Sequence, residues 1–366
     1  MEPYIPVTLP LKEIDWTSHI TSIGSASRAI ARYDGILRGI VNPVVLLSPL
    51  GTREAVISSR IEGTRATLQE VLQYEANIRE PDKPETELEI REILNYRQAM
   101  GYAVNELKSN AITINLIKEL HRILLTDVRG QDRNPGKIRD IQNWIAPPNT
   151  PIERASFVPP APRRVLGALS NWEEYLNSVE KDPLVQLAIL KAQFELIHPF
   201  CDGNGRIGRM LVPLILYKKE ILSSPVFYIS AYLEQNRPVY FERLLGVSRD
   251  NDWDSWISFF LQAIEAQANE NSSKAWSILE LYKEMKDKVP GIVRSQHATR
   301  AIDAIFSKPI FTTTYFVQSI GDNRMTATRI LNKLAEQGII ELRREGKGNR
   351  PSVYAFSRLL AITEKI

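Results

Sequence analysis

Cysteine is almost absent from this chain of 366 residues, because Cys201 is its only thiol. A single thiol excludes an internal disulfide and a metal site built from several cysteines, and it fits a reducing compartment. No apolar run approaches the roughly 18 to 20 residues that a membrane-spanning helix requires. Residues 1–10 also lack a basic stretch followed by an apolar core. We therefore expect a cytoplasmic protein without a membrane segment.

The chain also lacks a strong charge of either sign. It contains 46 Lys and Arg against 43 Asp and Glu, and the net charge of +3 is too small to indicate nucleic-acid binding by the whole chain. The hydrophobic content of 43% and the charged content of 24% exclude a disordered or fibrous protein. The positive charge is concentrated at the C-terminus, since residues 300–366 hold 11 Lys and Arg against 6 Asp and Glu.

Proline, glycine and apolar spacing divide the chain. Residues 1–50 contain five prolines and are predicted to be irregular and poor in helix. Between residues 130 and 162 helical spacing disappears, which indicates a hairpin or an extended flap. Helical spacing occurs at 51–74, 85–108, from 113 onwards, 164–179, 184–197, from 206 onwards, 240–245, 253–271 and 275–288. Pro290 and Gly291 are predicted to mark a boundary before a small last domain.

One loop, at residues 198–209, carries most of the groups that phosphate transfer requires. It reads HPFCDGNGRIGR and lies between two helical patterns. Pro199 is expected to end the preceding helix, which leaves the imidazole of His198 at a helix terminus. A histidine near its ordinary pKa accepts a proton from a hydroxyl group at neutral pH. His198 is therefore a candidate general base.

The rest of the loop is suited to anion and metal binding. Gly203 and Gly205 allow tight backbone geometry, and their amides, with those that open the next helix, form an anion-binding nest. Asp202 is a hard oxygen ligand of the kind that Mg²⁺ prefers. Arg206 and Arg209 are three residues apart on one helix face and can clamp phosphate oxygens.

This loop resembles the Fic motif, HPFx(D/E)GN(G/K)RxxR, and matches it at every specified position. The resemblance implies a helical core in which His198 is the base, Asp202 holds Mg²⁺ and the loop binds ATP. The implied ATP-binding residues are Gly203, Asn204, Gly205, Arg206, Ile207, Gly208 and Arg209. Because no key position is replaced, the pattern argues against a Fic fold that has lost its activity.

Two other interpretations of the loop fit less well. Doc-like relatives, which phosphorylate their targets, typically carry Ala and Lys at the positions of Gly203 and Gly205, so adenylylation is favoured. Cys201 lies close to the base and would allow a cysteine nucleophile. It occupies the unspecified position of the motif, however, and we expect it to be a packing residue.

A second motif at residues 58–63 reads SSRIEG and resembles the family's inhibitory motif, (S/T)xxxE(G/N), here Ser58, Glu62 and Gly63. Ser58 and Glu62 are four residues apart and would share a helix face. The resemblance implies an N-terminal inhibitory helix, whose glutamate pairs with Arg209 and keeps the γ-phosphate of ATP out of its productive position. The alternative is an ordinary exposed glutamate on a helix.

Two further segments resemble parts of the same family. Residues 136–160 resemble the hairpin on which a target protein docks, because extended backbone there would add a strand from the target. The alternative is an ordinary surface hairpin. Residues 236–240 read NRPVY and resemble the segment in which an asparagine recognises adenine, so Asn236 is the adenine candidate. Tyr240 also fits a core position.

The C-terminal residues resemble a winged helix. Residues 312–320 and 325–337 are predicted to form two short helices joined by a turn at 321–324, which is helix-turn-helix spacing. A strand from 338, a basic wing at 343–350 and a strand at 353–356 are expected to follow. Two uses remain open for this module, namely DNA binding through the second helix and the wing, or packing and protein contacts.

We predict a mainly α fold in three parts. These are an N-terminal segment with the inhibitory helix (1–110), a Fic-type helical core with a β-hairpin flap (111–289) and a winged helix (290–366). The predicted function is Mg²⁺-dependent transfer of AMP from ATP to a Ser, Thr or Tyr hydroxyl of a protein, the chain itself included. The alternatives are removal of AMP by the same site, or a DNA-binding regulator whose Fic domain senses a nucleotide. A homodimer, common in the family, is compatible with the sequence.

Overall fold

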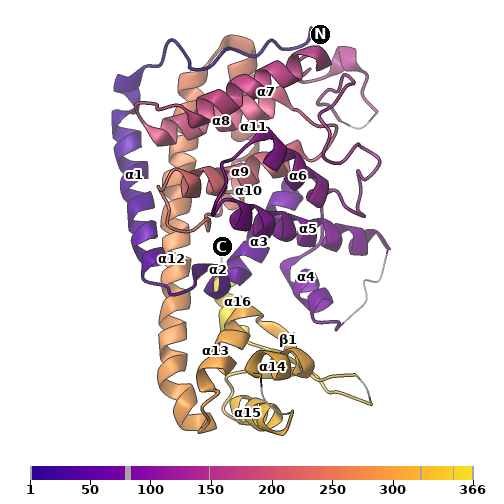
Figure 1. The fold of residues 1–366 in the computed structure, drawn as a ribbon, viewed down its shortest axis with the longest axis vertical. Coiled ribbons are helices and arrows are strands. Elements are labelled where there is room, and N and C mark those ends of the chain that lie inside the picture. Colours follow the sequence, from indigo (N-terminus) through magenta and orange to yellow (C-terminus); the bar gives the residue numbers. More distant parts are fainter. Residues whose placement is uncertain (1, 79–83, 148, 322–323, 349, 365–366) are drawn as a thin grey trace.

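The computed structural model describes residues 2–78, 84–147, 149–321, 324–348 and 350–364. The chain is mainly helical, with one small sheet near its C-terminus. The long helix α12 (Trp253–Val293) runs along one side of the molecule, and α1 (Trp16–Arg38) lies beside it (Figure 1). None of the described helices combines the length and the apolar character required to cross a membrane.

Helix α1 shows that the prediction of irregular, helix-poor structure for residues 1–50 is wrong. The helix begins after Asp15, whose carboxylate accepts a hydrogen bond from the Ser18 amide at 3.2 Å and so satisfies a donor of the first turn. Its buried face packs on α12, where Nε2 of His19 lies 2.8 Å from Asp254. All five prolines lie outside α1, so they bound this helix and do not disrupt it.

Two adjacent helices form the centre of the fold. Helix α8 (Pro183–Ile197) is buried from Leu184 to Ile197, as expected for a helix that other helices surround. Helix α9 (Asn204–Lys218) packs against it. The pair is contacted by α3 (Ser48–Ile61), α5 (Pro84–Glu106), α6 (Ile114–Leu124), α7 (Pro162–Asn177) and α11 (Arg237–Asp250). The remaining elements before α12 are α2 (Pro43–Leu46), α4 (Leu68–Glu75), η1 (Ile152–Arg154) and α10 (Ser230–Gln235). The connection between α8 and α9 therefore lies within a helical assembly.

The helical pattern predicted at 51–74 is divided between α3 and α4. Helix α3 ends at Ile61, and Gly63 follows with a φ of 99°. This backbone conformation favours glycine because a side chain would be strained there. Helix α4 then begins at a capping box formed by Thr67 and Glu70, which supplies partners for the first amides of the helix.

Helix α12 is continuous over 41 residues, which corrects the prediction of separate helices at 253–271 and 275–288. The polar residues between these two segments do not interrupt it, and the hydroxyl of Ser272 donates to the carbonyl of Ala268 one turn earlier at 2.7 Å. Pro290 lies inside the last turn, where its missing amide costs only one hydrogen bond. The helix therefore runs through the predicted boundary into the C-terminal part.

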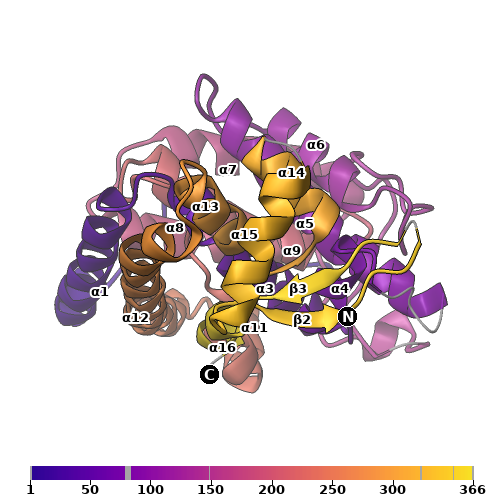
Figure 2. The ribbon, with the colours of Figure 1, turned by 90° about the horizontal axis from the view of Figure 1, so that it is seen from below.

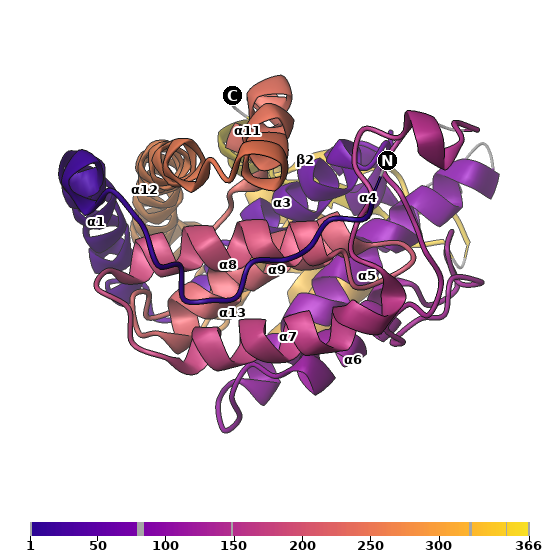
Figure 3. The same cartoon turned by 90° about the horizontal axis from the view of Figure 1, so that it is seen from above.

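The N-terminal residues cross over the α8–α9 pair (Figure 3). The Leu9 amide donates to Asn171 of α7 at 2.8 Å, and the carbonyl of Val7 accepts from Gln193 of α8 at 2.8 Å. The Tyr4 amide donates to the carbonyl of Val158 at 2.9 Å. The segment thus connects α7, α8 and the extended region that precedes α7.

The C-terminal part combines short helices with a three-stranded antiparallel sheet in the order β1-β3-β2 (Figure 2). Its elements are α13 (Ala298–Ser307), β1 (Ile310–Thr312), α14 (Thr313–Ile320), α15 (Arg324–Glu336), β2 (Glu341–Arg344), β3 (Val353–Ala355) and α16 (Ser357–Glu364). Residues 322 and 323 of the predicted turn and residue 349 of the predicted wing lie outside the described residues. The described elements follow one another in the order expected for a winged helix.

Candidate active site

The connection between α8 and α9 begins at His198, which caps the end of α8. Its φ is 48°, and its amide donates to the carbonyl of Phe194 at 3.1 Å. This left-handed conformation is uncommon for a residue other than glycine, and Pro199 prevents the helix from continuing. Gly203, with a φ of 75°, forms the cap that starts α9. The imidazole is thus at the helix end that the sequence predicted.

The side chain of Asn204 closes the loop from inside. Its Oδ1 accepts from the Phe200 amide, and its Nδ2 donates to the Phe200 carbonyl, both at 2.8 Å. Asn204 is 2% exposed. Its side chain therefore shapes the loop, and only its backbone amide remains for the predicted contact with ATP.

His198 has the properties of a neutral base. Its Nδ1 lies 3.3 Å from the carbonyl oxygen of Glu195, and because that oxygen can only accept, Nδ1 carries the proton in this contact. Nε2 is then the atom that can accept a proton. Burial lowers the pKa of His198, and this effect outweighs the negative charge of Glu195, which acts to raise it. The imidazole is therefore neutral at neutral pH.

The first turn of α9 presents backbone amides that lack partners within the helix. These belong to Asn204, Gly205 and Arg206, since the first amides of any helix have no intrahelical acceptor. Such amides favour anions. Ile207 and Gly208, which were also predicted to contact ATP, do not belong to this group of amides. The Ile207 amide donates to Gly203 at 3.1 Å, its side chain is fully buried, and Gly208 faces inward.

Asp202 stands at the open side of the loop, with 47% of its side chain exposed. Its Oδ1 accepts from the Gly203 amide at 2.5 Å and lies 3.7 Å from Arg206. No group of three or more potential ligands gathers among the described residues. This arrangement fits Mg²⁺, which takes one or two carboxylates from a protein and its other ligands from phosphates and water.

Arg209 is held by the end of α3. Its Nε donates to Oγ of Ser58 at 2.8 Å, and one terminal nitrogen donates to the Ser58 carbonyl and to Glu62 Oε1, both at 2.7 Å. The Arg209 side chain is 1% exposed and that of Glu62 is 39% exposed. Burial opposes the charge on Glu62, but Arg209 holds the pKa of this carboxyl below its ordinary value. Both groups are therefore ionised at neutral pH.

Glu62 also fills space above the first turn of α9. A Cβ atom added to Gly205 would lie 2.2 Å from Oε1 of Glu62, much closer than a Cβ atom approaches a nonbonded oxygen. Only glycine allows the carboxylate this close. The structure therefore places Glu62 beside the amides that would bind a phosphate, although it lies 147 positions from Arg209 in the sequence.

Glu92 of α5 contacts Arg206, the first arginine of the loop, and was missed by the sequence analysis. It lies 3.5 Å from a terminal nitrogen of Arg206 and 2.7 Å from Nε of Arg129. Nε of Arg206 is buried and has no hydrogen-bond partner among the described residues. A buried donor without a partner is rare in proteins, so a bound anion would satisfy it. Glu92 carries no sequence signal, because it is one of several acidic residues in α5.

A buried polar group behind α9 was also missed. The amino group of Lys191 contacts Glu195 one turn away and lies 3.2 Å from the hydroxyl of Tyr240. Gly208 packs directly on this pair. The spacing of four residues between Lys191 and Glu195 could have predicted an ion pair on one helix face. The other residues of α8 are mostly apolar, however, and do not indicate a buried polar group. The group fixes Glu195, whose carbonyl oxygen orients His198.

His121 of α6 links the loop to the predicted flap, a role that its isolated position in the sequence did not indicate. Its Nε2 lies 3.0 Å from the Asp202 carbonyl, and its Nδ1 lies 2.8 Å from the Gly136 amide. The ring stacks on Phe200 at 3.8 Å. Burial lowers the pKa of His121 to about 4. The neutral ring therefore donates from Nε2 and accepts at Nδ1.

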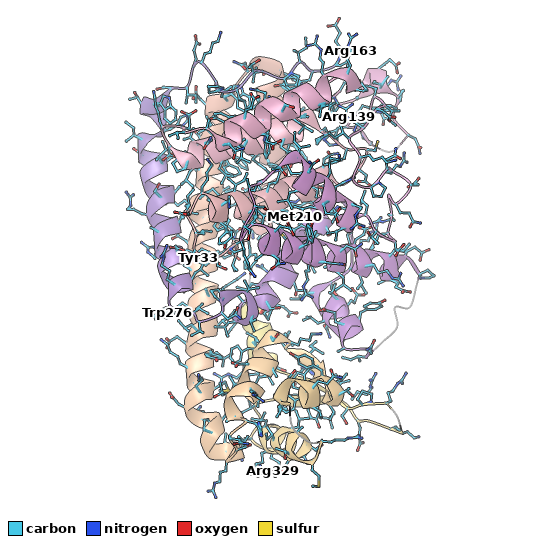
Figure 4. The ribbon with its side chains drawn as sticks, viewed as in Figure 1. Tyr33, Arg139, Arg163, Met210, Trp276 and Arg329 are labelled. Atoms are coloured by element: carbon cyan, nitrogen blue, oxygen red, sulfur yellow. The ribbon has the colours of Figure 1, made fainter. Side chains whose placement is uncertain are left out.

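Arg139 anchors the flap to the loop (Figure 4). Its side chain donates to the carbonyls of His198 at 2.8 Å and Pro160 at 2.6 Å, and its amide donates to Pro199 at 2.9 Å. Within the flap, Ile145 pairs with Phe157 in an antiparallel bridge. Residue 148 of the predicted docking segment lies outside the described residues.

Asn236, the adenine candidate, stands between α10 and α11. Its Nδ2 donates to the Tyr232 carbonyl at 2.9 Å. The neighbouring Arg237 donates to the carbonyl of Ile61 at 2.9 Å, which ties this segment to the end of α3. Tyr240 is 2% exposed, in agreement with the core position that its spacing favoured.

Cys201 does not have the properties of a nucleophile. Burial raises the pKa of its thiol, whereas nucleophilic cysteines react as thiolates and have a lowered pKa. Its side chain is partly buried. These properties favour the packing role expected for this position.

Glu54 connects α3 to α10, and it yields a prediction about stability. Its Oε1 accepts from the Ser230 hydroxyl at 2.6 Å, and burial raises its pKa to about 7. A raised pKa means that the folded state binds this proton more tightly than the unfolded state. The protonated Glu54 therefore stabilises the folded state fully below about pH 4.5, and this stabilisation is lost as the pH rises to about 7.

Glutamine cannot ionise, so we expect that Glu54→Gln does not lose unfolding free energy at this position as the pH rises. The unfolding free energy of the variant relative to the parent should rise by ~2–3 kcal/mol between about pH 4.5 and pH 8. Urea titrations across this range measure the difference, with Glu153→Gln on the exposed turn η1 as the control. Parallel pH profiles for parent and Glu54→Gln would contradict the prediction.

Comparison with known proteins places this geometry in a family. The model of the Fic/DOC family N-terminal region matches residues 20–105, and the Fic/DOC family model matches residues 111–216. Protein adenylyltransferase Fic of Nematostella vectensis is 30% identical over 167 residues, which are 44% of this chain and 36% of that protein. Protein adenylyltransferase fic-1 of Caenorhabditis briggsae is 34% identical over 110 residues, 29% of this chain and 20% of that protein. The matched segments thus span only a minor part of these relatives.

Solved structures show the same fold. A Fic family protein from Desulfovibrio desulfuricans superposes with a TM-score of 0.60 at 20% identity, covering 97% of this chain and 98% of that chain. Fic-1 of Caenorhabditis elegans (aa134–508) superposes with a TM-score of 0.53 at 20% identity, covering 72% and 74%. The two family models together match more than half of the 366 residues, and the chain therefore belongs to the Fic/DOC family.

Proposed function

We propose that this chain is a protein adenylyltransferase, which moves AMP from ATP to a Ser, Thr or Tyr hydroxyl of a protein, itself included. The observation that carries this proposal is the α8–α9 loop, where a neutral His198 lies in the same short connection as the free amides of α9. The names of the curated relatives support the same activity.

The reaction follows from the roles of the loop residues. Nε2 of His198 accepts the proton of the target hydroxyl. The hydroxyl oxygen bonds to the α-phosphorus of ATP, the bond from this phosphorus to the bridging oxygen breaks, and pyrophosphate leaves. The α9 amides and Arg206 stabilise the negative charge on the phosphate oxygens. Asp202 would hold Mg²⁺, which neutralises phosphate charge when it is bound.

We further propose that α3 restrains this reaction. Arg209, the second arginine of the loop, is engaged by Ser58 and Glu62. Glu62 also occupies the space above Gly205. Both contacts compete with a phosphate, one for the guanidinium group and the other for the amides. Gly63 allows the chain to turn away directly after the glutamate.

Two contacts with substrates complete the proposal. The target protein docks along the flap at 136–160, where Ile141 and Trp144 expose 56% and 43% of their surfaces. Apolar side chains beside extended backbone fit the addition of a strand from a partner. Asn236 recognises adenine from the start of α11, which Arg237 holds against α3.

Incubation with ATP labelled on its α-phosphate tests the reaction class. We expect the label to become covalently attached to protein, and ATP labelled on its γ-phosphate to leave none. Transfer of the γ-label would indicate phosphorylation. Release of labelled AMP from a modified protein without any transfer would support removal of AMP, with Glu62 orienting a water. Neither transfer nor release would support a domain that only senses nucleotide.

Asp202→Ala tests the proposed metal ligand. Because Asp202 is the exposed carboxylate of the loop, we expect the variant to transfer AMP at a much lower rate that hardly responds to Mg²⁺. The measurement is a Mg²⁺ titration of the initial rate, with Asp132→Ala in the neighbouring exposed loop as the control. A titration curve of Asp202→Ala that superimposes on that of the parent would remove Asp202 from this role.

A further inference from the structure

Helix α15 in the C-terminal part has one buried face and one open face. The inner face consists of apolar side chains that are fully buried, namely Ala327, Ile330, Leu331 and Leu334. The outer face carries Arg324, Met325, Thr328, Arg329, Asn332, Lys333 and Glu336. Met325 is 81% exposed. Packing of the C-terminal part on the rest of the chain therefore leaves this face of α15 open.

The open face lies at the end of the molecule that is furthest from α7. Arg329 projects from this end, and Arg163 at the start of α7 lies at the opposite end (Figure 4). Seen from below, α15 and the β2–β3 hairpin occur together on this surface (Figure 2). Helix α15 and strands β2 and β3 are thus all seen from this end of the molecule.

Some of the cations on this surface form no ion pair among the described residues. Other basic residues of the C-terminal part are engaged, since Lys333 donates to the carbonyl of Ile292 and Arg343 pairs with Glu341 at 2.9 Å. Arg344 contacts the carbonyls of residues 77 and 78. In contrast, no ion pair is formed within the described residues by Arg324, Arg329, Lys347 or Arg350, all of which are exposed. The positive charge of residues 300–366 is thus directed outward.

We propose that the outer face of α15, together with Lys347 and Arg350 between β2 and β3, binds duplex DNA, with α15 in the major groove. Helix α15 has 13 residues and is about 20 Å long, and a groove about 12 Å wide accommodates a helix. Helix α14 packs across it, as the first helix of a helix-turn-helix does. Thr328 and Asn332 offer hydrogen bonds to base edges, and the cations contact phosphates. This surface is separate from the His198 loop, so the proposal does not depend on AMP transfer.

Fluorescence anisotropy of the full chain with a labelled, random-sequence duplex of about two helical turns tests the proposal. We expect a Kd of roughly 10⁻⁴ to 10⁻⁶ M that increases steeply with salt. The double variant Arg324→Ala/Arg329→Ala should bind at least about tenfold more weakly, and the slope of log K against log salt should fall by about 2. The double variant Arg163→Ala/Arg164→Ala removes the same charge from exposed positions on α7 and should bind as the parent does.

Three results would overturn the proposal. They are no binding at low salt, an equal loss of affinity in both double variants, and equal binding of an RNA duplex of the same sequence. The last result would indicate a general attraction to polyanions, because the major groove of RNA is too narrow for a helix. Unchanged thermal unfolding of both double variants ensures that the comparison reports on binding.

Selection from a random DNA pool tests the placement of α15 in the groove separately. We expect a preferred sequence to emerge. Asn332→Ala should then lower the preference for it by about tenfold while leaving binding to the random duplex unchanged. Recovery of no preferred sequence, or an equal loss on both duplexes, would overturn the assignment of α15 as the helix that reads base edges.

Discussion

His198→Ala is expected to lower the rate of AMP transfer by about 10²- to 10⁴-fold while ATP binding stays close to that of the parent. The imidazole is assigned to proton abstraction, and the α9 amides and Arg206 are assigned to the phosphates. Because burial lowers the pKa of His198, the base remains neutral below its ordinary pKa of about 6.5. The parent should therefore retain activity at mildly acidic pH, and the acid limb of its pH profile should be absent from the variant.

The measurements are initial rates of α-labelled AMP incorporation over a range of pH, together with ATP affinity by calorimetry. His297→Ala, which removes an imidazole before α13 in the C-terminal part, is the control and should transfer AMP at the parent rate. Transfer by His198→Ala at the parent rate would show that another group is the base. A parallel loss of ATP affinity would show instead that the imidazole contacts the nucleotide.

Glu62→Gly is expected to raise AMP transfer, self-modification included, by at least about tenfold, which corresponds to ~1.4 kcal/mol in the activation free energy. The motivating geometry is the 2.7 Å contact between Glu62 and the buried Arg209. Removing the carboxylate makes this guanidinium group available to the γ-phosphate. It also empties the space above Gly205. Initial rates at saturating ATP measure the gain, and a variant no faster than the parent would show that α3 does not restrain the proposed transfer.

Glu62→Gln separates the two ways in which the glutamate would inhibit. Glutamine retains nearly the full volume of the side chain but lacks its charge. If the ion pair with Arg209 is what inhibits, Glu62→Gln should be activated almost as much as Glu62→Gly. If occupation of the space above Gly205 is what inhibits, Glu62→Gln should stay close to the parent. Ser58 keeps two contacts with Arg209 in both variants, so the comparison isolates the carboxylate.

The double variant Glu62→Gly/Arg209→Ala completes the cycle. We expect it to lose the gain of Glu62→Gly, because the released arginine is the group that the first substitution makes available. The four proteins of the cycle are measured under the same conditions. A double variant as fast as Glu62→Gly would show that the glutamate does not act through Arg209.

Several helices could be predicted because their signals are local. Helix α8 starts after Asp182, whose carboxylate accepts from two amides of the first turn, and it ends before Pro199. Helix α6 likewise starts directly after Thr113, the residue from which helical spacing was predicted, and the Thr113 side chain accepts from the Leu116 amide. Helix α1 was missed because the prolines of residues 1–50 indicate irregular structure for the whole segment, although all of them lie outside the helix. Helix α12 was predicted as two helices because polar residues interrupt its apolar spacing, a local signal that does not include its packing against α1.

The sequence by itself determined which groups residues 198–209 bring together, because covalent spacing alone places an imidazole, a carboxylate, glycine amides and arginines within one loop. Only the tertiary structure decided which distant groups meet them. Glu62 lies 147 positions from Arg209, Glu92 lies 114 positions from Arg206, and His121 lies 81 positions from Asp202. The physical reason is that the periodicity of a helix specifies which face is buried, whereas the packing of the whole chain selects the helix that covers it.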